Sequence, residues 1–281
     1  MLFYLQQNDS LLSLCHFHDQ AALPALRLQN FHALEGSRLR VLLCSCDSLC
    51  LRLNRVYRDW PYVVFLSSAY WAHAAHKPNL LVVTGPRNSA LWQELRDVTV
   101  ALRRVREPLI AIQVLATDSP GLGDEDDMLD PSVYDETIEC PAQGYDIFPF
   151  LEALRQAHGE EARYVTKLHT KSHDAWRQRL LKDVFHTRLG DPPQFLCNFT
   201  PSDTCVNTAC WKTLVATHAE ILPEPEPCRF VPGTMWTMPL ECLRPHITAL
   251  LSLSFTKDMR TGADGQVEHV LERYFGFLAG W

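Results

Sequence analysis

Residues 140–177 read CPAQGYDIFPFLEALRQAHGEEARYVTKLHTKSHDAWR. This stretch predicts a Gly-Tyr-Asp turn, a helix, and then a strand that ends in the sequence KLHTK. Successive side chains of a strand point to opposite faces, so we expect Lys167, His169 and Lys171 on one face. The small hydroxyl of Thr170 is expected beside them. Two cations and an imidazole seldom form a core, because buried charge without partners is very costly. The pattern favours a cradle for a phosphate or diphosphate, and the alternative is an edge strand with a solvated basic face.

The acidic residue of the turn, Asp146, directly precedes the predicted helix. An aspartate in this position either caps the helix, by accepting hydrogen bonds from its first backbone N–H groups, or contacts a ligand hydroxyl. Pro149 suits the first helical turn, where a missing N–H is tolerated. At the level of sequence, both roles of Asp146 stay open.

The composition is that of a globular protein. Of 281 residues, 47% are hydrophobic and 21% are charged, which is ordinary for a folded domain and unlike a disordered chain. The formal net charge of −7 argues against general nucleic-acid binding, which needs a basic surface. Any phosphate site must therefore be local, as the KLHTK cluster is.

Further patterns concern the location of the protein. No run of about 18 apolar residues occurs, so no transmembrane helix is expected. The first residues, MLFYLQQNDS, lack the basic and long apolar segments of a signal peptide. Ten cysteines are too sparse for a disulfide scaffold, which favours a reducing compartment such as the cytoplasm.

Strands and helices are predicted to alternate along the chain. Buried strands are expected at 40–46, 62–66, 80–84 and 109–115, and helices at 88–105, 239–253 and 266–277. Nearly continuous apolar strands are typical of a parallel sheet that is covered on both faces. We therefore predict an α/β layered domain with a largely parallel sheet.

An acidic loop at 117–133 offers the other chemical signal. Its run GDEDD contains Asp124 and Asp126, and an Asp-x-Asp pair is one way to hold a divalent cation such as Mn²⁺ or Mg²⁺ against a diphosphate. A short acidic run in a loop rich in Gly and Pro is also typical of solvated surface.

Three blocks of the sequence follow one another in a recognisable order. They are GYDIFPFL at 144–151, YVTKLHTKS at 164–172 with Trp176-Arg177, and FVPGTMW at 230–236 with the later Asp264, His269 and ERYFG at 272–276. Together they resemble the rhamnan synthesis protein F family, whose members are glycosyltransferase-related proteins of polysaccharide assembly. The resemblance covers roughly residues 108–277, and residues 1–105 match nothing in it. It departs from the family at Ala142-Gln143, where an asparagine is expected before the glycine.

The resemblance implies one domain over residues 1–281 with a GT-A-like nucleotide-binding fold. It implies transfer of a sugar, such as rhamnose or another deoxyhexose, from a nucleotide-sugar donor to an oligo- or polysaccharide acceptor. A cytoplasmic protein of this kind can also associate peripherally with a membrane. The alternative is a non-catalytic relative that binds glycans or acts as a scaffold.

The resemblance also suggests roles for single residues. Cations at the leaving diphosphate stabilise its developing charge, which is the role expected of the KLHTK face. The base that takes the acceptor proton is expected to be Asp264 or, second, His269, and the alternatives are a helix cap and a packed imidazole. Gly144 and Gly233 are expected to serve backbone geometry near the site. Trp236 is expected to stack on the ligand, whereas a core position is favoured for Trp176.

Overall fold

The computed structural model describes residues 78–281 apart from 88, 106–108, 119–131, 157–161, 188 and 258–263. Nearer the N-terminus it describes the backbone of short strands only. These are β1 (Leu2–Phe3), β2 (Gln6–Gln7), β3 (Ser10–Leu11), β4 (Cys15–His16), β5 (Phe31–Ala33), β6 (Arg40–Cys44) and β7 (Val63–Ser67). The last two confirm the strands expected at 40–46 and 62–66.

A five-stranded sheet forms the centre of the described part. Its order is β10-β9-β8-β11-β14, and all neighbours are parallel except the last pair, β11 and β14. The strands are β8 (Asn79–Pro86), β9 (Leu109–Thr117), β10 (Glu136–Pro141), β11 (Tyr164–His169) and β14 (Trp236–Pro239). The first strand of this sheet along the chain is β8, in the middle. The chain then adds β9 and β10 on one side of β8, and β11 on its other side. The strand order therefore reverses between β8 and β11.

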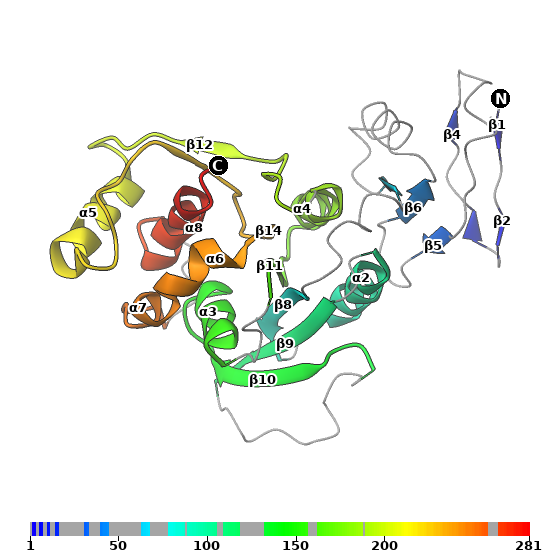
Figure 1. Ribbon diagram of the computed structural model, residues 1–281, viewed down its shortest axis with the longest axis horizontal. Coiled ribbons are helices and arrows are strands. Elements are labelled where there is room, and N and C mark those ends of the chain that lie inside the picture. The colour runs from blue at the N-terminus through cyan, green and yellow to red at the C-terminus, as the bar shows by residue number, and fades with distance from the viewer. Residues whose placement is uncertain are drawn as a thin grey trace.

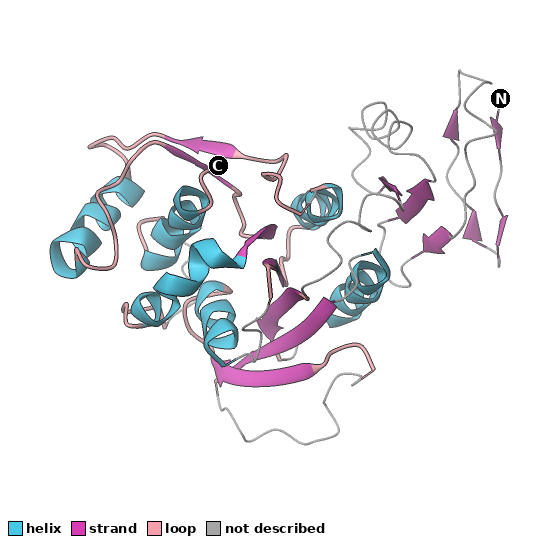
Figure 2. Ribbon diagram, in the orientation of Figure 1, coloured by secondary structure: helices cyan, strands magenta, loops and turns pink. Residues whose placement is uncertain are grey.

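Helices cover both sides of this sheet, as Figure 2 shows. Helix α2 (Trp92–Val105) and helix α3 (Ile147–Gln156) lie on opposite sides of β8 and β9 (Figure 1). The central strands are apolar because both of their faces are covered. In β11 all six residues are buried, and Lys167 is among them with no exposed surface. These features confirm an α/β domain with a mostly parallel sheet.

The remaining elements belong to the carboxyl-terminal half of the chain. They are α4 (Asp174–His186), β12 (Cys197–Phe199), α5 (Val206–His218), β13 (Cys228–Phe230), α6 (Leu240–Leu243), the 3-10 helix η5 (Arg244–His246), α7 (Ile247–Leu251) and α8 (Val267–Leu278). The single helix expected at 239–253 is in fact three short ones. Pro245 explains the break, because proline has no N–H for the helical ladder and crowds the preceding turn.

Two findings bear on the expected location. None of the helices in the described part of the chain has both the length and the apolar character that a membrane crossing needs. The cysteines that the structure describes from residue 140 onward are all free thiols.

Candidate functional site

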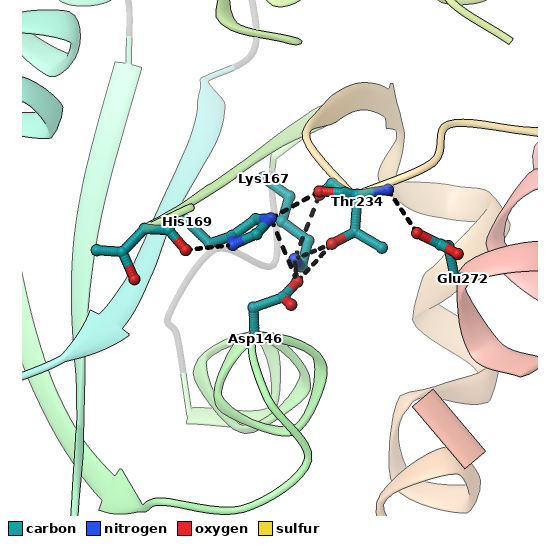
Figure 3. A network of polar contacts seen from close by, with 7 residues as sticks. Asp146, Lys167, His169, Thr234 and Glu272 are labelled. Atoms are coloured by element: carbon teal, nitrogen blue, oxygen red, sulfur yellow. Dashed lines mark hydrogen bonds and ion pairs between the residues drawn. The ribbon is translucent and has the colours of Figure 1, made fainter. Parts of the chain in front are cut away.

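Two turns meet at the carboxyl end of β11. The Gly144–Asp146 turn follows β10 and leads into α3, and the Gly233-Thr234 turn leads into β14. Because β14 runs antiparallel to β11, its beginning lies at the carboxyl end of β11, where Lys167 pairs with Trp236. Figure 3 shows the side chains from these segments pointing toward one another.

Lys167 lies at the centre of this group and is fully bonded. Its Nζ donates to Oδ2 of Asp146, to the carbonyl oxygen of Thr234 at 3.2 Å and to the hydroxyl oxygen of Thr234 at 3.0 Å. A lysine ammonium has three N–H donors, so these acceptors use all of them. The ring of Phe150 lies 5.6 Å from the same nitrogen. The expectation that Lys167 cradles a phosphate is therefore wrong, since its ammonium is buried and has no donor left for a ligand.

Asp146 is the counter-ion of this ammonium. Its Oδ2 also accepts the hydroxyl proton of Thr234, and Nε2 of His169 stands 3.9 Å away. Burial acts to raise the pKa of Asp146, but the charges of His169 and Lys167 and the two hydrogen bonds outweigh it and lower the pKa well below its ordinary value. Burial in turn lowers the pKa of Lys167, and the Asp146 carboxylate opposes that shift. The carboxylate thus cross-links β11 to the 233–234 turn.

The two turns beside the ion pair have unusual backbone conformations. Gly233 has φ 90° and Thr234 has φ 53°, and in the other turn Gly144 has φ 62° and Tyr145 has φ 51°. A positive φ suits glycine, as expected for Gly144 and Gly233, but it is rare for a β-branched threonine. Strained residues of this kind persist where surrounding bonds hold them, and they cluster at binding sites and active sites.

His169 holds the same turn from the strand side. Its Nε2 lies 2.6 Å from the carbonyl oxygen of Gly233, and its Nδ1 lies 2.9 Å from the carbonyl oxygen of Thr170. Burial lowers the pKa of His169 and the nearby Asp146 carboxylate opposes the shift. A neutral imidazole can donate to only one of these carbonyls, so a second N–H bond requires the charged form. With both nitrogens engaged, His169 is a positioning residue.

Helix α8 holds the Gly233-Thr234 turn from the side opposite to β11. Glu272 accepts the backbone N–H of Gly233 at 2.5 Å and pairs with Arg273 at 3.0 Å. Burial raises the pKa of Glu272, and these two partners oppose the shift. One turn earlier, His269 is partly exposed, and its ring centre lies 6.4 Å from that of Tyr145. Its buried Nδ1 has no hydrogen-bond partner in the part of the chain that the structure describes.

The two residues expected as the base are therefore placed differently. Asp264 is exposed, and within the described ranges no hydrogen bond or ion pair joins its carboxylate to the group around Lys167. Its neighbour Gly265 is anchored to Asn207 at the start of α5. His269 lies against the group, close enough for its charge to act on Glu272.

Lys171 stands just beyond β11 and is half-buried. Its Nζ lies 4.1 Å from the ring centre of Trp176, and 3.1 Å from the position that a Cβ on Gly233 would take. Among the described residues no carboxylate pairs with this ammonium. Arg177 fixes the backbone here, since it donates to the carbonyl oxygen of Lys171 at 2.5 Å and to Glu94 of α2 at 2.9 Å.

Thr170 lies against the carboxyl end of β8. The N–H of Thr170 donates to the carbonyl oxygen of Thr84 at 3.1 Å. A Cβ on Gly85 would come within 2.5 Å of the Thr170 methyl group, so glycine is what lets the two strand ends approach. Lys171 and Thr170 thus lie where the strand order reverses.

The two tryptophans are placed opposite to expectation. Trp236 is 1% exposed, with Phe150 and Phe275 packed edge-on at 5.4 and 5.6 Å between ring centres. It is a core residue, so the prediction that it stacks on a ligand is wrong. Trp176, for which a core position was favoured, is 37% exposed on the first turn of α4.

The expected metal ligands Asp124 and Asp126 lie outside the described residues. Within the described ranges no cluster of three His, Cys, Asp or Glu side chains could hold a metal ion. Asp146 does not fit one either, because its inner oxygen is occupied by Lys167 and Thr234 and a second basic group lies nearby.

No family model, curated protein or solved structure matches this chain. The similarity to the rhamnan synthesis proteins rests on the three sequence blocks alone. Residues of all three blocks meet in the group around Lys167: Asp146 of the first, Lys167 and His169 of the second, and Gly233, Thr234 and Glu272 of the third.

Proposed function

We propose that this protein is a glycosyltransferase with a GT-A-like fold that moves a sugar from a nucleotide-sugar donor to a glycan acceptor. The main support is the convergence of the three sequence blocks at the carboxyl ends of β8 and β11. In open α/β sheets, ligands bind outside the carboxyl ends of the strands where the strand order reverses. The donor sugar, rhamnose or another deoxyhexose, is suggested by the sequence resemblance only.

Lys171 is the proposed partner of the donor diphosphate. Sugar transfer leaves negative charge on the departing diphosphate, and a cation held nearby stabilises it. Of the three basic residues of KLHTK, Lys167 and His169 have their N–H groups engaged by the protein, whereas Lys171 has an ammonium that no described carboxylate neutralises. Any divalent cation would be held by Asp124 and Asp126.

His269 is the proposed base in preference to Asp264. An imidazole can take the proton of an acceptor hydroxyl, and the neighbouring Glu272 carboxylate stabilises the resulting charge. Asp264 is exposed and stands apart from the group around Lys167.

The test uses the full chain and a panel of nucleotide sugars with UDP, GDP or dTDP, with and without Mn²⁺. At least one should bind in calorimetry, and Lys171→Ala should weaken that binding about tenfold, as the loss of one charge-assisted contact implies. Ser172→Ala, an exposed neighbour, is the matched control. If no nucleotide sugar binds, the proposal fails.

Release of nucleoside diphosphate then measures turnover. His269→Gln should lower it by at least about a hundredfold, the usual contribution of a general base, and Asp264→Asn should not. The reverse outcome would move the base to Asp264. The second candidate, a non-catalytic glycan-binding relative, is favoured by the complete internal bonding of the Lys167 ammonium. Binding of glycans without any nucleotide release would support it.

A further inference from the structure

Trp176 is the most exposed of the tryptophans in the described part of the chain. Trp92, Trp211 and Trp236 are at most 4% exposed and Trp281 is partly buried, whereas Trp176 is 37% exposed. Among the described side chains, only Val206 is a comparably exposed large hydrophobic residue. An indole left in water forgoes a large stabilisation by burial, and exposed aromatic rings are typical of binding surfaces.

The backbone that carries the indole is also held in place. The N–H of Trp176 donates to Nδ1 of His173, the residue that caps α4, at 3.3 Å. The next residue, Arg177, is 6% exposed and joins α4 to Glu94 and to the carbonyl oxygen of Lys171. Arg177 therefore fixes the backbone at Lys171 and at the first turn of α4, which carries Trp176. The two side chains themselves meet where the Lys171 ammonium lies over the indole ring.

We propose that Trp176 and Lys171 form the subsite for the sugar-phosphate end of the donor. The Lys171 ammonium binds a phosphate oxygen, and the indole packs against the apolar C–H face of the sugar ring. This inference rests on the proposed function and adds the residue that recognises the sugar.

The distance favours the sugar over the nucleobase as the occupant. The Lys171 nitrogen lies 4.1 Å from the indole centre, so a phosphate in contact with it brings the group bonded directly to that phosphate against the indole. In a nucleotide sugar this group is the transferred sugar on the β-phosphate and the ribose on the α-phosphate, and the base lies beyond the ribose in either case.

The two carboxylates closest along the chain and across to α2 have a partner other than Lys171. Asp174 is paired with Arg177 at 2.9 Å, and Glu94 is paired with the same guanidinium at 2.8 Å. Neither of them forms an ion pair with the Lys171 ammonium.

Calorimetry on the full chain tests the assignment with matched ligands. The probes are UDP, GDP and dTDP, each compared with UDP-glucose, GDP-mannose and dTDP-rhamnose respectively. For the pair that the wild type binds, the attached sugar should tighten binding by about tenfold. Trp176→Ala should abolish this gain and leave the affinity for the nucleoside diphosphate unchanged, and Trp176→Phe should keep part of it. Lys171→Ala should weaken both ligands, and Ser172→Ala should weaken neither.

Each other outcome is decisive. Equal weakening of both ligands by Trp176→Ala would place the nucleotide on the indole and overturn the inference, as would no effect on either. A wild type that binds the nucleoside diphosphate without any gain from the sugar would overturn it and leave the proposed function standing. A wild type that binds none of the six probes would overturn both. Because Trp176 is exposed, the melting temperature of Trp176→Ala should match that of the wild type, which separates loss of recognition from loss of fold.

Discussion

The replacement Asp146→Asn tests whether the buried ion pair organises this part of the fold. It removes one negative charge with little change of shape, and it leaves the Lys167 ammonium with neutral oxygens as its only hydrogen-bond acceptors, among them the two of Thr234. Lys167 has no exposed surface, so water cannot replace the carboxylate. Breaking a buried pair in this way costs about 3–5 kcal/mol of the free energy of unfolding. The converse change, Lys167→Met, should cost less, because the Asp146 side chain is 20% exposed and water can reach it.

The assay is urea unfolding of the wild type, both single variants and the double variant, followed by circular dichroism. If the two groups stabilise each other, the double variant should lose at least about 1 kcal/mol less than the sum of the single losses. Asp203→Asn is the control, since its pair with Lys212 is on the surface and its loss should have no measurable effect. The reasoning is refuted if Asp146→Asn is as stable as this control, or if the losses simply add.

The contribution of Asp146 to the free energy of unfolding should depend on pH. The folded protein lowers the pKa of Asp146 below its ordinary value, so the unfolded chain binds this proton more readily. The stability that Asp146 contributes is therefore present above the unfolded pKa of about 3.9 and is lost as the pH falls through the lower, folded pKa. The difference between the wild type and Asp146→Asn should be larger at neutral pH than in strong acid, and a constant difference would contradict this.

Two further predictions concern the packing around the site. A Cβ on Gly276 would overlap the carbonyl oxygen of Arg229, so Gly276→Ala should lower the free energy of unfolding by about 1–3 kcal/mol in urea. Ala279→Ser, at the end of the same helix, should have a smaller effect, and equal effects would argue against this contact. Burial raises the pKa of Asp183 to about 6, although its carboxylate accepts the N–H groups of Gln194 and Phe195. Since this folded pKa lies above the unfolded one, the stability that the group contributes should fall as the pH rises from about 4 to 6, and Asp183→Asn should remove that part of the slope.

Much of the sheet was predictable because its inner strands are buried on both faces. The runs at 80–84 and 109–115 lie within β8 and β9, and the helix expected at 266–277 matches α8. The edge strand β10 was missed, since its sequence ETIECP alternates partly exposed polar residues with buried ones and has no apolar run. The helix α5 was missed as well, because few of its residues are buried and its apolar stripe is weak.

The gathering of Lys167 and His169 on one face of β11 was predictable, but their depth was not. Alternation along a strand tells which face a side chain takes, and it correctly put Lys167 and His169 together. It does not tell what lies over that face. The partners that bury Lys167 come from Asp146 and Thr234, which are 21 and 67 residues away along the chain, so only the tertiary structure brings them together. For the same reason, the burial of Trp236 and the exposure of Trp176 were not predicted, because packing between residues distant in sequence decides which side chain is covered.

Gly233 connects the buried group to the proposed ligand site. Its N–H is held by Glu272 and its carbonyl oxygen by His169, and both bonds fix a turn that starts with φ 90°. On its open side the missing side chain leaves room for the end of Lys171. Lys167 and Lys171 thus have different roles. Lys167 stabilises the turn through its hydrogen bonds to Thr234, and the Lys171 ammonium lies against Gly233 without a carboxylate partner among the described residues. Any change that loosens the Asp146–Lys167 pair should therefore displace the Lys171 ammonium without touching it, so stability and ligand binding are coupled at this turn.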